Sequence, residues 1–299
     1  DNIEKISGIK PTFENFDLAD KAKTIDFFER NVGIDAIIHF AASKAVGESV
    51  EKPLLYYRNN LVSMMNILDC QLEFDVANIV FSSSCTVYGQ PDVLPVTEQT
   101  PRKDAESPYG NTKRVNEDIL SETIAANSKL KAIALRYFNP FGAHPTALIG
   151  ELPLGVPQNL VPFITQTAAG LRDEIKVFGD DYDTADGSAV RDYINVVDLA
   201  QAHVVAINRL LTGKNKSNYE VFNLGTGNGY SVLEMINGFE AATGVKLNYK
   251  IVGRRAGDIE KIWADTTFAN EELGWKAEKG LEETLLTAWN WEKKVRGIK

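Results

Sequence analysis

The stretch NIVFSSSC, residues 78–85, begins with an apolar run and stops abruptly in three hydroxyls and a thiol. A short, bounded run of this kind is typical of a strand buried on both faces of a parallel sheet. DAIIHFAA at 35–42 has the same character but ends in small residues, and LKAIALRYFNP at 130–140 ends in Asn139-Pro140. We therefore predict three buried strands over these ranges.

Helical patterns lie between the predicted strands. A long helical region follows the first strand, with Pro53 near its start and YYRNNLVSMMNILDC (56–70) carrying apolar residues at i, i+3 and i+4 spacing. SPYGNTKRVNEDILSETIAA at 107–126 is a second predicted helix. This alternation of strand and helix predicts an α/β fold with a doubly wound, parallel, Rossmann-type sheet.

The character of the sequence changes after Pro140. The segment GAHPTALIGELPLGVPQN (142–159) is rich in glycine and proline and is typical of a loop. Shorter elements follow, and we predict a helix at 159–171, a strand at 175–178, a strand–helix unit at 191–211, a strand at 219–224, a helix at 231–242 and further pieces at 247–252, 267–275 and 280–294. We expect residues 1–139 to form the sheet domain and residues 140–299 to form mainly a smaller α/β substrate-binding lobe, with segments interleaved into the first.

The bulk composition narrows the function classes. With 44% hydrophobic and 24% charged residues over 299 positions, the chain resembles an ordinary soluble globular protein. Its formal net charge of −9 argues against a nucleic-acid-binding surface. No apolar run approaches the ~18 residues of a membrane span, and the start DNIEKISGIK lacks the features of a signal peptide. We expect neither nucleic acid nor a membrane as a partner.

The cysteines and histidines argue against disulfides and bound metal. Cys70 and Cys85 lie in an apolar helix-like run and beside a strand, which favours free thiols in a reducing cytoplasm. His39, His144 and His203 show no metal-ligand spacing. We therefore predict a cytoplasmic protein without a metal site.

Tyr109 and Lys113 stand four residues apart in the second predicted helix, so they share one helix face. An ammonium beside a phenol lowers the phenol pKa from ~10 toward neutrality, as a general base needs. The spacing alone is close to what chance supplies, and taken alone it favours a solvent-facing lysine one turn from a half-buried tyrosine. The context favours catalysis, because ligands of parallel sheets bind beyond the carboxyl ends of the strands. Ala41-Ala42, Ser82-Ser83-Ser84 and Phe138-Asn139 are predicted at those ends.

Seven motifs occur in a fixed order along both predicted parts of the chain. They are FAASKAVGESV (40–50), FSSSCTVYGQP (81–91), SPYGNTK (107–113), LRYFNPFGAHP (135–145), GSAVRDYINVVDLA (187–200), NLGTG (223–227) and RRAGD (254–258). In sequence and order they resemble the extended short-chain dehydrogenase/reductases, and most closely the UDP-glucose (UDP-galactose) 4-epimerases. The resemblance runs from about Pro11 to the end of the chain.

The resemblance implies a reversible oxidation. Tyr109 would take the proton of the sugar 4-hydroxyl, Lys113 would tune Tyr109 and hold the nicotinamide ribose, and Ser84 would hydrogen-bond the same hydroxyl. Tightly bound NAD would take the C4 hydride, and the 4-keto sugar would turn in the pocket before hydride returns to its other face. The family pattern also implies a homodimer through the helices at 53–73 and 107–126.

Further ligand residues follow from the same resemblance, matched motif by motif. Besides Ser84, Tyr109 and Lys113, the NAD site would include Asp17, Leu18, Phe40, Ala41, Ala42, Lys44, Asn59 and Phe138. The UDP-sugar site would include Ser84, Tyr109, Lys44, Asn139, Asn159, Phe178, Arg191, Tyr193, Arg255 and Asp258. Arginines suit a diphosphate because they can bind it bidentately.

Two positions sharpen the expected reaction. Related nucleotide-sugar 4,6-dehydratases resemble this chain but carry an Asp-Glu pair where Cys85-Thr86 stands. Eliminating water needs an acid and a base there, so a dehydratase or decarboxylase is the less favoured enzyme. The resemblance also places Ile262 at the border of the hexose pocket. A bulky side chain there would crowd an N-acetyl group and a small one would admit it, so the intermediate size of isoleucine leaves open whether UDP-N-acetyl sugars are substrates.

The Gly-rich turn that opens the family's dinucleotide fold is not among the motifs. No G-x-x-G-x-x-G occurs near the first residues, and the resemblance places the start of the chain about 35–45 residues late, before the third strand of that fold. We expect a longer protein; the alternative is a shortened, cofactor-less protein that binds UDP-sugars or acts as a scaffold. A folded chain of this span should be unstable and prone to aggregate, because an open parallel edge would be exposed.

Overall fold

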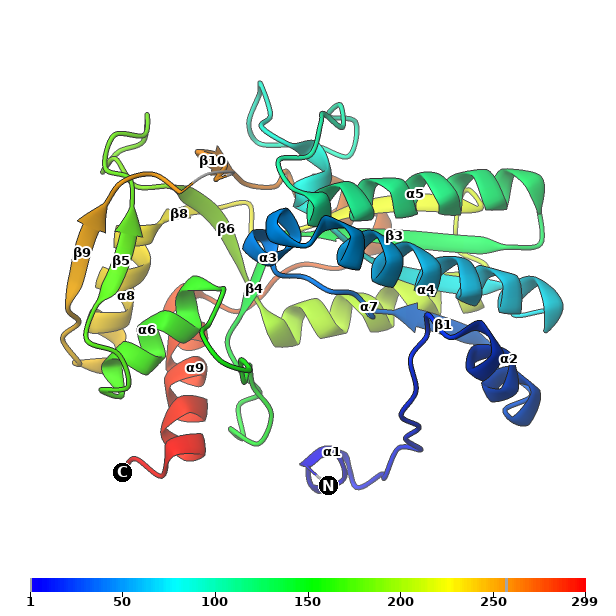
Figure 1. The fold of residues 1–299 in the computed structure, drawn as a ribbon, viewed down its shortest axis with the longest axis horizontal. Coiled ribbons are helices and arrows are strands. Elements are labelled where there is room, and N and C mark those ends of the chain that lie inside the picture. The colour runs from blue at the N-terminus through cyan, green and yellow to red at the C-terminus, as the bar shows by residue number, and fades with distance from the viewer. Residues whose placement is uncertain (1, 256–257) are drawn as a thin grey trace.

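The computed structural model describes residues 2–255 and 258–299, and it contains two groups of elements side by side (Figure 1). One group holds the longer helices α4, α5 and α7 around strands β1 to β3. The other holds shorter strands with helices α6, α8 and α9. In the described part of the chain, no helix is both long enough and apolar enough to cross a membrane.

The first group is built on a four-stranded parallel sheet. Its strands are β1 (Ala36–His39), β2 (Asn78–Ser84), β3 (Lys131–Tyr137) and β7 (Tyr219–Leu224), in the order β1-β2-β3-β7. The register pairs Ser84 with Tyr137 and Tyr137 with Leu224, so three strands end level with one another. The parallel sheet predicted from the apolar runs is confirmed.

Helices cover both faces of this sheet. Strand residues alternate between the faces: Ile79 and Phe81 pack with α4 (Pro53–Glu73) and α5 (Pro108–Ala126), whereas Val80 packs with α7 (Val196–Leu211). A strand buried on both sides must be apolar along its whole length, which explains the runs in the sequence. The arrangement is the doubly wound α/β fold that the alternation of elements predicted.

Local signals in the sequence fix the start of α5. The Ser107 side chain accepts a hydrogen bond from the Gly110 backbone N–H at 3.2 Å, and Pro108 occupies the first turn. Leu120 and Ile124 then turn toward the sheet and are buried. Tyr109 and Lys113 therefore lie in the first two turns of a firmly capped helix.

The second group contains two small sheets. In one, β6 (Val190–Asn195) lies between β4 (Asn139–Phe141) and β10 (Lys261–Ile262), with β8 (Gly229–Ser231) antiparallel to β6; in the other, β5 (Ile175–Phe178) pairs with β9 (Tyr249–Val252). Helices α6 (Leu160–Ala168), α8 (Val232–Thr243) and α9 (Leu281–Arg296) bury a common core with β4, β5 and β6. Gly142 has φ +90 after β4, and a Cβ there would lie 2.7 Å from Thr284 Cγ2 on α9. Glycine lets the chain turn against that helix.

The predicted strand at 130–140 is wrong in one respect, because the structure divides it. β3 ends at Tyr137, Phe138 is buried among Cys85, Tyr88 and Ile262, and β4 then pairs with β6 in another sheet. The hydrophobic pattern continues through this point because both strands are buried. Pattern alone therefore does not reveal the change of sheet.

Several short elements escaped prediction. They are the helices α1 (Asn2–Ser7), α2 (Lys21–Arg30) and α3 (Val46–Glu51), the 3₁₀ turn η1 (Cys85–Tyr88), and the strands β8 and β10. These elements are too short to show a clear period in the sequence, or they depend on distant partners for their hydrogen bonds. The piece predicted at 267–275 contains the π-helical turn η2 (Ala269–Leu273).

Candidate active site

Ser84 and Tyr109 meet where β2 ends. The Ser84 hydroxyl accepts a hydrogen bond from the Thr86 backbone N–H at 3.3 Å and so begins η1. Helix α5 approaches this turn closely at Gly110, which has no side chain. A Cβ at this position would lie only 3.2 Å from Thr86 Cβ. The same approach places the Tyr109 phenol near the Ser84 side chain, which lowers the pKa of the phenol. The two residues predicted to act on one hydroxyl are thus adjacent.

Lys113 is buried beneath this pair. Its side-chain nitrogen donates to the Ser82 carbonyl oxygen at 2.5 Å and lies 4.9 Å from the centre of the Phe81 ring. Burial lowers the pKa of Lys113 to about 7, while the nearby Glu117 carboxylate opposes that shift. The negative charge of Glu117 therefore favours the ammonium form of Lys113.

Lys113 is not among the groups that shift the pKa of Tyr109 most in this structure, and the expected tuning stays a prediction. Burial raises the pKa of the Tyr109 phenol, Tyr137 adds to the rise, and the Ser84 contact only partly offsets it. Lys113 Nζ is 6.0 Å from the centre of the Tyr109 ring and donates instead to the strand backbone. Helical spacing correctly places both side chains on one face, but it does not determine which acceptor the ammonium chooses.

The residues predicted to line NAD at the end of β1 form a short segment held by α4. The Ser43 backbone N–H donates to Asn60 Oδ1 at 2.8 Å, and Asn60 Nδ2 donates back to the Ser43 carbonyl at 3.0 Å. Asn59 donates to the Ser43 hydroxyl at 3.0 Å. Ala41 and the 54% exposed Phe40 remain accessible at its start, and Ala42 is half-buried. Asn60 is a positioning residue that sequence reasoning missed.

Asp17 and Leu18 lie in the turn that precedes α2, and neither forms a hydrogen bond with Ser84 or Tyr109. The Asp17 carboxylate accepts from the Ala19 backbone N–H at 2.9 Å, as in an ordinary turn. The Leu18 carbonyl accepts from Asn66 Nδ2 of α4 at 2.8 Å. Their assignment to the adenine remains an expectation from the resemblance.

Asp258 gathers the two predicted diphosphate arginines. Arg255 donates to both its oxygens, at 3.1 and 2.7 Å, and Arg191 Nη2 lies 3.8 Å from Asp258 Oδ1. The Arg255 guanidinium is 5.6 Å from the centre of the Phe178 ring. Four predicted ligand residues, from β5, β6 and the loop before β10, thus form one cluster; positions 256–257 of the RRAGD motif lie outside the described residues.

Asn139 and Tyr193 connect this cluster to the sheet. They are register partners across β4 and β6, and Tyr193 directly follows Asp192 in the strand that carries Arg191. Burial raises the pKa of Tyr193 to about 12, while the Arg191 charge opposes the rise. Ile262 is buried and pairs with Arg191, so the position that the resemblance places at the hexose pocket lies directly beside a predicted ligand.

Lys44 and Asn159 meet on a carboxylate that was not predicted. Lys44 Nζ lies 3.7 Å from Glu151 Oε1, and Asn159 Nδ2 donates to the same oxygen at 2.7 Å. Glu151 belongs to the Gly/Pro-rich loop, where no periodic pattern could reveal its role. It links the segment after β1 to the start of α6.

Asp192 accounts for the NLGTG motif. Its fully buried carboxylate accepts from the Thr226 backbone N–H and hydroxyl, both at 2.8 Å, from the Gly227 N–H at 3.1 Å and from the Ala264 N–H at 3.2 Å. These bonds fix β6 against the loop after β7 and the strand that carries Ile262. The acidic residue beside Arg191 was a signal available in the sequence, but its four donors are distant in the chain.

Comparisons with known proteins decide the family. A family model described as GDP-mannose 4,6 dehydratase matches residues 1–287. UDP-glucose 4-epimerase 2 of Arabidopsis thaliana is 50% identical over 285 residues, covering 95% of this chain and 80% of that protein. The chain belongs to the UDP-glucose 4-epimerase family, within the extended short-chain dehydrogenase/reductases.

Other members of the family agree with this assignment. The human UDP-glucose 4-epimerase is 45% identical over 291 residues, covering 97% of this chain and 82% of that one. The crystal structure of the Bifidobacterium longum UDP-glucose 4-epimerase in complex with NAD+ and UDP superposes with a TM-score of 0.94 and 45% identity, covering 100% of this chain and 88% of that one. The resemblance inferred from the seven motifs is confirmed.

The burial of Lys113 predicts a pH dependence of stability. Above pH 7 the folded protein loses the Lys113 proton, while the unfolded chain keeps it up to about pH 10, so the unfolded state binds more protons in this window. Wild-type stability should therefore rise with pH relative to Lys113→Met, by about 1 kcal/mol per pH unit. Chemical denaturation at pH 7, 8 and 9 measures this difference, and Lys129→Met on the surface is the control. Parallel stability curves for wild type and Lys113→Met would contradict the assignment.

Proposed function

We propose that this chain interconverts UDP-galactose and UDP-glucose by reversible oxidation at C4 of the sugar. The observation that carries the proposal is the meeting of Ser84 and Tyr109 at the end of β2, with Lys113 buried beneath them. Three relatives with 46–50% sequence identity to this chain are UDP-glucose 4-epimerases, and they also support the proposal.

The residues near the end of β1 fit a dinucleotide cofactor. Small side chains at Ala41 and Ala42 allow a ligand to approach the backbone, and the largely exposed Phe40 ring offers an apolar face. An ammonium has three N–H donors, and Lys113 directs one of them to Ser82, which leaves two for the hydroxyls of a ribose. When bound, NAD would accept the hydride from C4. The positive charge of its oxidised form would also lower the pKa of a nearby phenol.

In the proposed reaction the chain's own groups handle the proton. Tyr109 accepts the proton of the 4-hydroxyl as the C4–H bond breaks, and Ser84 donates a hydrogen bond to the same oxygen. The product of this step is a 4-keto sugar, which turns so that its other face receives the hydride. Tyr109 then returns the proton, and the net change is inversion at C4 with no consumption of cofactor.

The arginine cluster suits the rest of the substrate. Arg191 and Arg255 present charged donors to a diphosphate, and Asp258 keeps them close together before ligand arrives. We propose that the part of the substrate between this cluster and Tyr109 is bound by four further residues: Lys44, Asn139, Asn159 and Tyr193. Residues 1–139, together with α7 and β7, would form the NAD-binding part, supported by the pairing of β7 with β3.

A 4,6-dehydratase is the second candidate because the matching family model carries that description. Cys85 and Thr86 argue against it, since neither offers a carboxyl and burial raises the pKa of the Cys85 thiol to about 12. A product lighter than the substrate by one water would support the dehydratase. A product of unchanged mass supports the epimerase.

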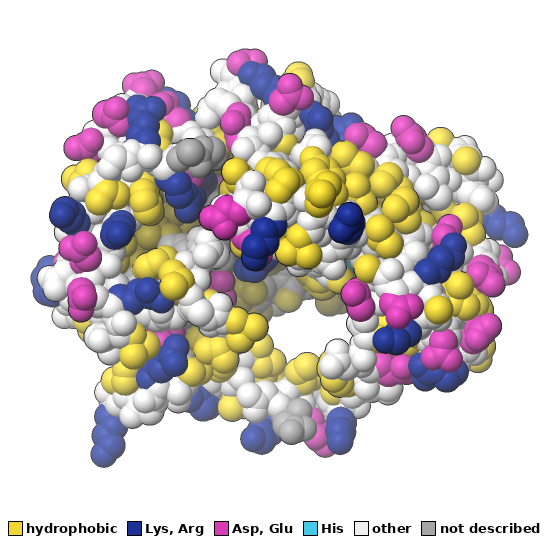
Figure 2. All heavy atoms as spheres, in the orientation of Figure 1, with side chains coloured by type: hydrophobic (Ala, Val, Ile, Leu, Met, Phe, Trp, Pro, Cys, Tyr) yellow, Lys and Arg dark blue, Asp and Glu magenta, His cyan; other side chains and the backbone are white. Residues whose placement is uncertain are grey.

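We also propose that the protein is a cytoplasmic homodimer. Leu54, Leu61, Met65 and Leu72 follow one another along one face of α4 at helical spacing, and three of them are more than 40% exposed. Figure 2 shows hydrophobic side chains gathered over α4 and the adjoining part of α5. Two copies that pair through this face would cover it. The buried free thiols of Cys70 and Cys85 fit a reducing compartment.

Removing the Tyr109 hydroxyl should abolish turnover while leaving nucleotide binding intact. Tyr109→Phe, assayed with NAD and UDP-galactose, should lose about 100-fold or more of kcat, because Tyr109 is the group proposed to take the proton. Ser84→Ala should lose less, and Tyr249→Phe, on exposed β9, is the matched control. UDP affinity by calorimetry should stay within about threefold of wild type. Wild-type rates in Tyr109→Phe, or no turnover by wild type with NAD, would sink the proposal.

Charge on the exposed face of α4 should prevent dimerisation. Leu54→Glu with Met65→Glu places two carboxylates in the proposed interface, where burying them without partners is costly. Light scattering coupled to size exclusion should give a dimer mass for wild type and a monomer mass for the variant. Leu211→Glu, at a similarly exposed position on α7, should remain dimeric. A monomeric wild type would contradict the proposal.

A further inference from the structure

Glu117 carries a buried carboxylate directly behind the candidate active site. Its side chain is 1% exposed. Oε1 accepts from Arg136 Nε at 2.9 Å and from the Ser83 hydroxyl at 2.5 Å, and Oε2 accepts from Arg136 Nη2 at 2.6 Å. Arg102 Nη1 approaches Oε2 from the partly exposed side at 3.4 Å. Both oxygens are therefore saturated by donors from other elements.

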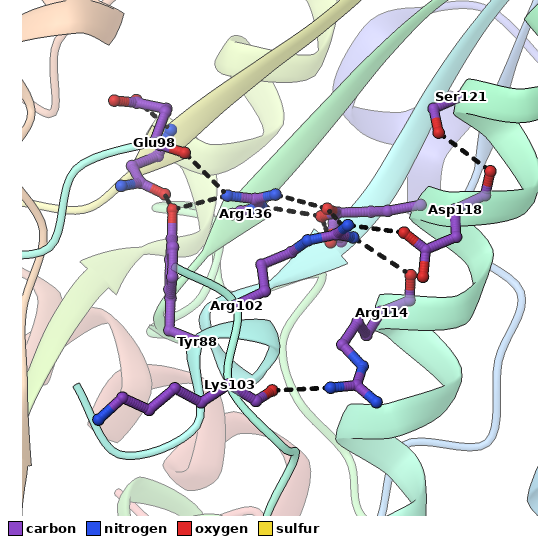
Figure 3. Close-up of polar contacts among 11 residues, drawn as sticks. Tyr88, Glu98, Arg102, Lys103, Arg114, Asp118, Ser121 and Arg136 are labelled. Carbon is purple, nitrogen blue, oxygen red and sulfur yellow. Dashed lines mark hydrogen bonds and ion pairs between the residues drawn. The ribbon is translucent and has the colours of Figure 1, made fainter. Parts of the chain in front are cut away.

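These contacts join every element that carries a candidate catalytic group. Glu117 lies on α5 with Tyr109 and Lys113, Ser83 lies on β2 beside Ser84, and Arg136 lies on β3. Arg136 also donates to the Tyr88 hydroxyl at 3.0 Å, at the end of η1. Figure 3 shows Arg136 extended between Tyr88 on one side and the helix that bears Asp118 and Ser121 on the other. The ion pair is thus a junction between helix, strands and turn.

Glu117 also stands one helical turn beyond Lys113, on the same face of α5. The charged and titratable groups around the Lys113 ammonium are His39 of β1, Tyr109 above it and Glu117 below it, with Arg136 behind Glu117. Burial lowers the pKa of His39 to about 4, so it is neutral at pH 7 and brings no charge. Glu117 is the acidic group among them.

Stability does not explain this pair well. A buried ion pair contributes little more to folding stability than apolar side chains of similar size, because the cost of desolvating the charges offsets their attraction. The specific placement of the carboxylate, between the strand that ends in Ser84 and the helix that carries Lys113, points to a second role.

We propose that Glu117, held by Arg136 and Ser83, is a positioning residue for the epimerase reaction: it keeps the Lys113 ammonium charged and fixes α5 against the end of β2. The inference rests on the proposed function. Glu117 touches neither Tyr109 nor the reacting atoms in this arrangement, and acts through Lys113 and through the Ser83 hydroxyl.

The first test is Glu117→Gln, which keeps the shape but removes the charge. It should lower kcat about 10- to 100-fold with KM changed less than about threefold, because the reacting groups are displaced and not the nucleotide site. The alkaline limb of the kcat profile should move to lower pH by about one unit, because Lys113 loses the charge that favours its ammonium form. Glu122→Gln, exposed on the same helix, should match wild type in both respects.

Two further variants cover a failure of Glu117→Gln to fold. Glu117→Gln with Arg136→Met removes both charges, so no unpaired charge is left buried, and should show the same loss of kcat. Ser83→Ala deletes only the link to β2 and should lose about tenfold or less of kcat without shifting the pH profile. Ser121→Ala, whose hydroxyl bonds only the Asp118 carbonyl of its own helix, is its control.

The outcomes separate the two proposals. Wild-type kcat and an unshifted profile in folded Glu117→Gln, or in the double variant, would overturn the role of Glu117 while leaving the epimerase proposal intact. A reduced kcat with an unshifted profile would overturn the charge effect. Absence of turnover by wild type itself would overturn both proposals.

Discussion

The parallel register of β1, β2, β3 and β7 is the constraint on which the site depends. Parallel strands bring all their carboxyl ends to one edge, so the small residues after β1 and the serines of β2 lie at a common border. Helix α5 begins at that border, so its first two turns place Tyr109 and Lys113 there. The substrate cluster joins it because the chain leaves β3 at Phe138 and enters the second group of strands as β4.

Much of this arrangement could be predicted from the sequence, and the failures have physical causes. Apolar runs at 78–85 and 130–140 identified buried strands, and motif order identified the family. The ligand residues that the motifs imply stay a prediction. The division of 130–140 into two strands depends on Phe138 packing against Cys85 and Ile262, which are distant in the chain. Asn60 and Asp192 were missed for the same reason, because they form hydrogen bonds with segments 17 or more residues away. Glu151 was missed because it lies in a loop without a periodic pattern.

Burial makes the electrostatics of the site the least predictable part. Helical spacing suggested that Lys113 lowers the pKa of Tyr109, yet burial raises the pKa of the phenol and lowers the pKa of the lysine to about 7. Both groups then depend on charges supplied from outside the pair. Glu117 supplies the negative charge within the chain, and the oxidised cofactor has the sign of charge that the phenol needs. In this account the site is active only when the Glu117–Arg136 ion pair and the oxidised cofactor are both in place.

The central claim is that the site exchanges a hydride at C4 and a proton at the 4-hydroxyl. Nuclear magnetic resonance of the UDP-glucose formed from UDP-galactose in D₂O tests it most directly. The account predicts that C4 of the product keeps its original hydrogen, because that hydrogen leaves and returns as a hydride that does not exchange with solvent. Deuterium at C4 of the product would contradict the account, since it would require removal of that hydrogen as a proton.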